Sequence, residues 1–155
     1  MDIKLGNQYP AGALSNLAPH KFVFRGFNCG SMEGLCQGLK FKDPNMQVHV
    51  FTLSGHAARG AGQGKNWQKT QTLWWQGEAV KRDSDTYQEL FDEAYACLFD
   101  QNAKARKALL ATKSATLQHS IGRRKISETV LTVREFCSRL TKNRDRIQAE
   151  EFLEF

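Results

Sequence analysis

The sequence has no apolar run near the roughly 18 residues that a membrane-spanning helix needs. Residues 1–6, Met-Asp-Ile-Lys-Leu-Gly, lack the apolar stretch of a secretory signal. These two absences predict a cytoplasmic protein without a membrane partner. Internal repeats and low-complexity blocks are also missing, so neither a repeat array nor a disordered chain is expected.

Cysteine is scarce, and its spacing matches no known metal or disulfide pattern. The four cysteines form no Cys-x-x-Cys pair, which favours free thiols in a reducing compartment. His49 and His56 stand seven residues apart in one helical pattern, but no carboxylate accompanies them at metal-ligand spacing. No metal site is predicted.

Two common catalytic motifs are absent. The glycine-rich stretch 60–66, Gly-Ala-Gly-Gln-Gly-Lys-Asn, has three residues between its first glycine and the Gly-Lys pair, whereas a P-loop has four. A nucleoside triphosphatase is therefore not expected. Two interpretations of this stretch remain open: a flexible connection, or a loop that holds phosphate through backbone N–H groups and Lys65. No Gly-x-Ser-x-Gly elbow occurs either.

Composition and charge are those of a folded chain with an anionic partner. The 155 residues, 41% of them hydrophobic and 25% charged, suit one domain spanning 1–155. We expect its core at about 12–140 and an acidic tail at 141–155. The net charge of +6 favours nucleotides, phosphates or nucleic acid, and the densest basic cluster is Arg123-Arg124-Lys125.

Periodicity predicts a compact α+β fold that is mostly helical, with a short hairpin. Residues 20–27 alternate and can turn at Arg25-Gly26, which indicates the hairpin. Helices are expected at 30–42, at 46–59 (where 48–51 also fit a strand), from a cap at Asp83 or Ser84, and at 103–111. A loop is expected at 60–65, a polar connection at 116–128 and a short strand at 128–132. Thr132-x-x-Glu135 is a capping box that would open a last helix ending near Leu140.

The segment 30–42 carries the clearest functional signal. Its apolar residues share one helical face, and Glu33, Gln37 and Lys40 line another. Gly34 and Gly38 lie beside this polar row, although each costs a helix about 1 kcal/mol relative to alanine. One interpretation is a ligand wall beside a glycine notch. The other is an ordinary solvent-facing surface on a helix capped by Ser31.

Aromatic and histidine side chains offer further candidates. Trp67, Trp74 and Trp75 could stack on a base, whereas Tyr87 and Tyr95 lie on an apolar stripe and are expected in the core. His119 could contact a ligand or cap the preceding helix.

These pieces, in this order, resemble the NADAR superfamily, whose fold is YbiA-like. Ser15-Asn16-Leu17 resembles its early Ser-Asn-hydrophobic signature, and residues 31–41 resemble its Ser-x-Glu-x-x-x-Gln-x-x-Lys-aromatic helix. The family's central tryptophan motif is similar to Leu73-Trp-Trp-Gln-Gly77 followed by Tyr87-Gln88. Its Lys/Leu-Phe-x-Gln-Asn motif is similar to Phe99-Asp-Gln-Asn102, and its Leu-Leu-x-Thr helix end is similar to Leu109-Leu-Ala-Thr112. The likeness covers about 12–140.

The resemblance implies a small, metal-independent N-glycosidase without a cofactor. Its substrates would be phosphoribosyl-amine intermediates of riboflavin synthesis, or ADP-ribose attached to a base. The resemblance makes Glu33 the central carboxylate and places four residues at the pocket: Asn16, Gln37, Lys40 and Trp75.

General chemistry is compatible with these roles. A fixed carboxylate near ribose C1 can stabilise an oxocarbenium-like state or orient water. Lys40 could hold Glu33 ionised or meet a phosphate, and Arg123 and Arg124 could fork onto a pyrophosphate. Asn16 and Gln37 could hold ribose hydroxyls, and Trp75 could stack on the base.

The sequence also departs from the family pattern. Many members carry Asp-x-x-Trp-Gly-x-Gly after the Leu-Leu-x-Thr step, but here the region contains neither the Asp nor the Trp. Either His119, Arg123 and Glu128 replace them, or the protein binds ADP-ribose without cleaving it. A third hypothesis, drawn from the net charge, is a nucleic-acid protein. The expected partner is a small nucleotide-like substrate or ADP-ribosylated nucleic acid, and the oligomeric state is left open.

Overall fold

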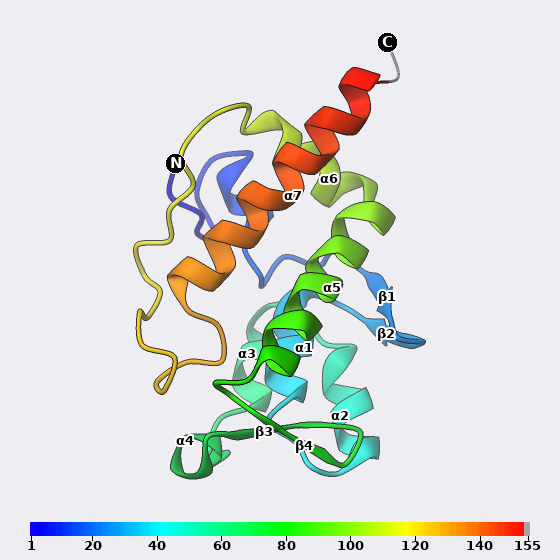
Figure 1. Ribbon diagram of the computed structural model, residues 1–155, viewed down its shortest axis with the longest axis vertical. Helices are drawn as coiled ribbons and strands as arrows, with labels where there is room; N and C mark the ends of the chain where they lie inside the picture. Colours follow the sequence, from blue (N-terminus) through cyan, green and yellow to red (C-terminus); the bar gives the residue numbers. More distant parts are fainter. Residues whose placement is uncertain (154–155) are drawn as a thin grey trace.

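A computed structural model describes residues 1–153 as seven α-helices, one short 3-10 helix and two β-hairpins (Figure 1). This arrangement confirms the predicted α+β class. The first elements are η1 (Ala11–Leu14), β1 (Phe22–Phe24), β2 (Phe27–Cys29), α1 (Met32–Gly38), α2 (Pro44–Phe51) and α3 (Gly55–Ala61). They are followed by α4 (Trp67–Thr70), β3 (Thr72–Trp75), β4 (Glu78–Lys81), α5 (Asp85–Gln101), α6 (Ala103–Ala111) and α7 (Val133–Leu153).

The first hairpin forms where the sequence predicts it. β1 and β2 pair antiparallel, and the two turn residues, Arg25 and Gly26, have φ angles of 50° and 86°. Positive φ at both positions matches the right-handed twist of the strands. Phe22 and Phe24 are buried while Val23 is exposed, as the alternation predicts.

Helix α5 supplies the centre of the core. It begins after Ser84, whose Oγ accepts a hydrogen bond from the Tyr87 N–H at 3.2 Å. One face of the helix is almost fully buried, and its members are Tyr87, Leu90, Phe91, Ala94, Tyr95 and Leu98. This face packs against α1, α6, α7 and β1. The predicted cap at Ser84 and the apolar stripe are both confirmed.

Three predictions about local structure are wrong, and one apolar patch whose secondary structure the sequence leaves open is a strand. The helix expected at 46–59 is two helices, because the chain turns at residues 52–54 and Gly55 adopts a φ of 58°. The Leu-Trp-Trp patch is strand β3, paired antiparallel with β4 through a turn at Gln76-Gly77. Residues 128–132 form no strand. The last helix passes Leu140 and runs to Leu153, because residues 143, 144 and 147 on its inner face are buried.

The glycines of α1 pack against protein, which corrects their predicted place beside a ligand. A Cβ on Gly34 would lie 2.6 Å from the carbonyl oxygens of Phe51 and Leu53, and one on Gly38 would overlap the Phe51 ring. The missing side chains therefore let α1 sit directly on the end of α2. The predicted apolar face, Met32, Leu35, Cys36 and Leu39, is buried as expected.

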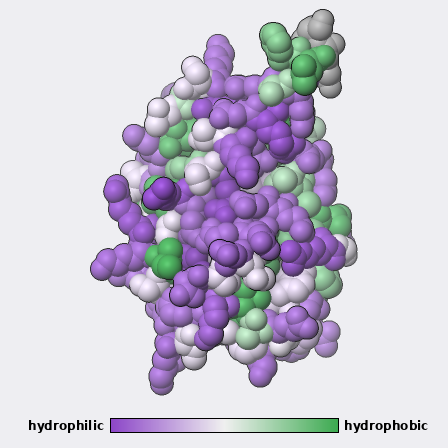
Figure 2. Space-filling view, viewed as in Figure 1, coloured by the Kyte–Doolittle hydropathy of each residue, from purple (hydrophilic) through white to green (hydrophobic). Residues whose placement is uncertain are grey.

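The surface in Figure 2 is mostly hydrophilic. An apolar patch at its top lies at the end of α7, where Phe152 and Leu153 are exposed. No helix among the described residues is long and apolar enough to cross a membrane.

Replacing Gly34 with alanine should destabilise the protein. The added methyl group must push the end of α2 away, which we expect to lower the free energy of unfolding by about 1–3 kcal/mol despite the better helix propensity. Gly60→Ala is the matched control, because Gly60 also lies in a helix but a Cβ there meets nothing within 4 Å. That variant should gain about 0.5–1 kcal/mol. Urea unfolding measures both, and equal stability of the two variants would contradict this packing.

Candidate active site

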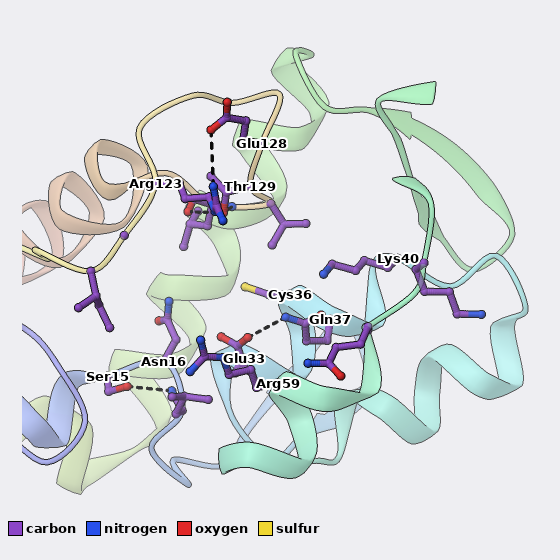
Figure 3. Close-up of a pocket in the computed structure, with 18 of the residues that line it drawn as sticks. Ser15, Asn16, Glu33, Cys36, Gln37, Lys40, Arg59, Arg123, Glu128 and Thr129 are labelled. Atoms are coloured by element: carbon purple, nitrogen blue, oxygen red, sulfur yellow. Dashed lines mark hydrogen bonds and ion pairs between the residues drawn. The ribbon is translucent and has the colours of Figure 1, made fainter. Parts of the chain in front are cut away.

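A cleft of about 630 Å³ opens between two parts of the chain. One wall is formed by α1, α3 and the loop that follows α3; the opposite side is residues 119–132, which we call the roof segment (Figure 3). Seven of the residues predicted for the site line this cleft: Asn16, Glu33, Gln37, Lys40, His119, Arg123 and Glu128. A volume of this size is typical of small-molecule sites.

Glu33 is fixed at both its backbone and its side chain. Ser31 caps α1, with its Oγ accepting from the Gly34 N–H at 3.0 Å. The Glu33 N–H donates to the Asn16 carbonyl at 2.9 Å. Gln37 Nε2 donates to Glu33 Oε1 at 2.8 Å. The second carboxylate oxygen makes no hydrogen bond within residues 1–153, so one oxygen is held and the other is available to a ligand.

Asn16 is oriented by a buried tyrosine. The Tyr95 hydroxyl, fully buried in the core, donates to Asn16 Oδ1 at 2.7 Å. The amide oxygen is therefore used inside the protein, and the amide nitrogen is left for the cleft (Figure 3). Asn16 and Glu33 are thus joined by a backbone hydrogen bond and present a donor and an acceptor at the same end of the cleft.

Gln37 holds the Glu33 carboxylate through a hydrogen bond and is itself buried. It is only 7% exposed, and its Oε1 is buried without a hydrogen-bond partner. The backbone of Gly62 covers that oxygen, because a Cβ at Gly62 would overlap it. The predicted contact between Gln37 and a ribose hydroxyl stays a prediction, and the hydrogen bond that the structure contains is to Glu33.

Positive charge predominates in the cleft. Five of the lining residues are lysine or arginine and two are glutamate; the cations are Lys4, Lys40, Arg59, Lys65 and Arg123. Burial lowers the pKa of Lys40, and the neighbouring Cys36 and Glu33 offset part of this effect. Five cations around two carboxylates favour an anionic ligand.

The roof segment has no regular structure, because side chains bind its carbonyl groups. Gln71 donates to Ser127, Gln68 to Glu128, Arg82 to Thr129 and Tyr87 to Val130, at 2.5–2.9 Å. Four successive carbonyl groups are thereby satisfied without a partner strand. These contacts, which join residues 43 to 60 positions apart, explain why the strand predicted at 128–132 does not form.

A buried ion pair anchors the roof segment to α7. Arg82 has no exposed surface, and its Nη1 donates to Glu135 Oε2 at 3.0 Å. Glu135 also completes the predicted capping box, accepting from the Thr132 N–H at 2.8 Å while its own N–H donates to Thr132 Oγ1 at 3.1 Å. Burial raises the pKa of Glu135, but hydrogen bonds from Arg82, Gln88 and Thr132 outweigh it and bring the pKa to about 2.

The three residues expected to replace the missing family positions all reach the cleft. His119 Nδ1 lies 2.6 Å from the Ile3 carbonyl oxygen, and its ring packs edge-on against Phe136. Arg123 is 70% exposed at its side chain and forms an ion pair of 3.8 Å with Glu128. His119 is therefore tied to the N-terminal segment, and the charges of Arg123 and Glu128 partly neutralise each other.

Sequence comparison places the chain in a family. A family model described as bacteriophage protein GP30.3 matches residues 8–145. The chain belongs to this bacteriophage protein family. It is 39% identical over 150 residues to an uncharacterized 17.1 kDa protein in the Gp30-rIII intergenic region of Enterobacteria phage T4, covering 95% of this chain and 98% of that protein.

Structure comparison confirms the YbiA-like fold. The NMR structure of the E. coli protein YbiA superimposes with a TM-score of 0.61, covering 98% of this chain and 89% of YbiA. The two sequences are 20% identical, so this likeness concerns the fold. The GP30.3 family model and the YbiA fold together account for nearly the whole chain.

Two residues predicted for the site lie elsewhere. Trp75 packs against the rings of Phe24, Phe27 and Phe51 at centroid distances of 5.4–5.7 Å, and the Arg25 guanidinium covers it. Strand β3 carries Trp75 to this aromatic cluster, so Trp75 does not line the cleft. Arg124, next to Arg123 in sequence, does not line it either.

Sequence reasoning missed other lining residues. His56 and Arg59 of α3 line the cleft, although neither is predicted as a ligand-binding residue. Trp67 and Lys65, which the sequence offers as candidates for base stacking and phosphate binding, also line it. The three-residue spacing of His56 and Arg59 was available as a signal, because it places both on one helical face. No group of three or more His, Cys, Asp or Glu side chains that could hold a metal occurs in residues 1–153.

The Arg82–Glu135 pair should make stability depend on acid pH. Because the folded-state pKa of about 2 lies below the ordinary value of 4.5, the stabilisation is complete above pH 4.5 and is lost as the pH falls toward 2. Glu135→Gln should lower the free energy of unfolding at pH 7 by about 3 kcal/mol.

Urea unfolding between pH 7 and pH 3 measures this effect. The gap between wild type and Glu135→Gln should narrow by about 2 kcal/mol at the acid end, because wild type loses the same interaction there. Glu78→Gln, which changes an exposed carboxylate without a hydrogen bond in the described chain, is the control. A gap that stays constant with pH would contradict the assignment.

Proposed function

We propose that this protein is an N-glycosidase that hydrolyses the bond between ribose C1 and a nitrogen atom in an ADP-ribose-like or phosphoribosyl substrate. The observation that carries the proposal is the placement of Glu33. It stands in a cationic cleft with one oxygen held by Gln37 at 2.8 Å and the other without a protein partner. A fixed carboxylate in a cleft lined by positively charged side chains suits a ribosyl phosphate.

The reaction needs stabilisation of positive charge at C1 and at the ring oxygen. As the C1–N bond breaks, its electron pair goes to the nitrogen and the ribose becomes oxocarbenium-like. Glu33 can stabilise this state or orient the attacking water. The water oxygen bonds to C1, and the departing nitrogen takes up a proton, so that the products are a free base and a ribose with a C1 hydroxyl.

The neighbouring groups can position the substrate. Asn16, with its amide oxygen held by Tyr95, can donate to a ribose hydroxyl. Lys40 and the other cleft cations can hold phosphate oxygens. The net charge of +6 suits either a small nucleotide or ADP-ribosylated nucleic acid.

A binding module that holds ADP-ribose without cleaving it is the second candidate. The observation that favours it is the environment of the second carboxylate in the cleft. Glu128 is the only other acidic residue among those that line the cleft in the described chain, and it is 47% exposed and paired with Arg123. Release of free base from an ADP-ribosylated nucleoside, followed by mass analysis, separates the candidates.

Glu33→Gln should abolish turnover while preserving the fold and ligand binding. We expect a loss of at least about 100-fold in kcat, because a neutral amide stabilises the developing charge poorly. The dissociation constant for ADP-ribose should stay within about threefold of wild type, since Glu33 carries none of the phosphate contacts. Glu78→Gln, a change of the same chemistry on the exposed strand β4, should keep full activity.

The assay offers ADP-ribosylated nucleosides and N-glycosides of ribose 5-phosphate to each variant, with free base quantified by mass spectrometry. Full activity in Glu33→Gln would remove Glu33 from the mechanism. Tight binding by wild type with no base released from any of these compounds would favour the binding module.

A further inference from the structure

The wall formed by α3 and its following loop carries an arginine, Arg59, that no residue of the described chain neutralises. Arg59 and His56 make no hydrogen bond or ion pair within residues 1–153, and both line the cleft. By contrast, Arg123 across the cleft is already paired with Glu128 at 3.8 Å. The unpaired Arg59 therefore lies across the cleft from Arg123, the residue that the sequence analysis associates with a pyrophosphate.

The loop after α3 brings a second cation, Lys65, to this wall. Gly62 lies against Gln37 and Lys40 of the neighbouring polar row, since a Cβ at Gly62 would overlap the Gln37 amide and lie 2.9 Å from Lys40 Cδ. Two residues on, Gly64 has a φ of 79°, which turns the chain back and leaves Lys65 at the cleft. The Lys65 ammonium lies over the Phe41 ring at 4.4 Å.

Three cations from separate elements thus border one end of the cleft. Arg59 comes from α3, Lys65 from the loop, and Lys40 from the turn that ends α1; Figure 3 shows Lys40 and Arg59 on this wall with Glu33. Like charges in one cleft repel one another unless an anion lies between them. Guanidinium offers paired N–H donors that match phosphate oxygens, and lysine supplies point charges.

The size of the cleft favours a diphosphate over a monophosphate. A ribose monophosphate would leave much of the 630 Å³ occupied by water, whereas a ribose linked through a diphosphate to a nucleoside falls in the size range of ligands for such a cleft. Cations on three elements can also contact two phosphate groups at once.

We propose that a diphosphate subsite is formed by Arg59, Lys65 and Lys40, and not by Arg123 and Arg124. The proposal rests on the proposed function for the position of the ribose, which would lie between this subsite and Glu33. The ligand class is a ribose joined through a diphosphate to a nucleoside, for which ADP-ribose is the probe.

Binding of ADP-ribose and of ribose 5-phosphate, measured by isothermal titration calorimetry, tests the subsite. Arg59→Gln and Lys65→Gln should each weaken ADP-ribose binding about tenfold, since each removes a charged contact to phosphate. Their effect on ribose 5-phosphate should be smaller, because one phosphate cannot engage all three cations. Lys69→Gln removes the same charge from an exposed position on α4 outside the cleft and should bind as wild type does.

Arg123→Gln tests the alternative that Arg123 binds the diphosphate. Loss of ADP-ribose binding in Arg123→Gln with wild-type binding in Arg59→Gln and Lys65→Gln would overturn the subsite. Failure of wild type to bind ADP-ribose would overturn it too. Far-UV circular dichroism checks that the variants fold, which is expected because Arg59 and Lys65 are exposed.

The two proposals fail in different ways. If Arg59→Gln and Lys65→Gln weaken binding but wild type releases no base from any ribosyl substrate, the subsite stands and the glycosidase does not. If wild type turns over its substrate and these variants keep both KM and the dissociation constant, the subsite is wrong and the glycosidase stands.

Discussion

The close packing of α1 against the end of α2 decides which way Glu33 faces. Gly34 allows contact with the backbone around Phe51 and Gly38 allows contact with the Phe51 ring, while the apolar face of α1 enters the core. With two sides of a seven-residue helix covered, the row from Glu33 to Lys40 has only the cleft left to face. The cost of two glycines in a short helix is offset by this contact, and the site depends on it.

The other side of the cleft depends on side chains from elsewhere in the fold. The roof segment lacks a helix or strand, and its shape follows from donors on α4, on the residue between α4 and β3, on the residue after β4 and on α5. Arg82 links this segment to Glu135 at the start of α7. Stability and site geometry are therefore coupled here: an interaction that holds the protein together also sets the position of the residues that face Glu33.

Local signals explain what the sequence predicts well. The turn at Arg25-Gly26, the cap at Ser84 and the box formed by Thr132 and Glu135 each involve residues at most three positions apart, and all three are confirmed. The polar row on α1 likewise follows from helical spacing.

Long-range contacts explain what the sequence does not predict. Trp75 joins an aromatic cluster 24 residues away, at Phe51, and the break after α2 reflects packing on α1. Arg59 faces the cleft because α3 lies against α1; the spacing of His56 and Arg59 places both on one helical face, but it does not show what that face meets.

A crystal structure of the protein with ADP-ribose tests the central claim most directly. Our account predicts the ribose C1 within reach of the Glu33 carboxylate, directly or through one water molecule, and the diphosphate against Arg59 and Lys65. Electron density for the ligand outside the cleft, or inside it with the ribose turned away from Glu33, would contradict the account.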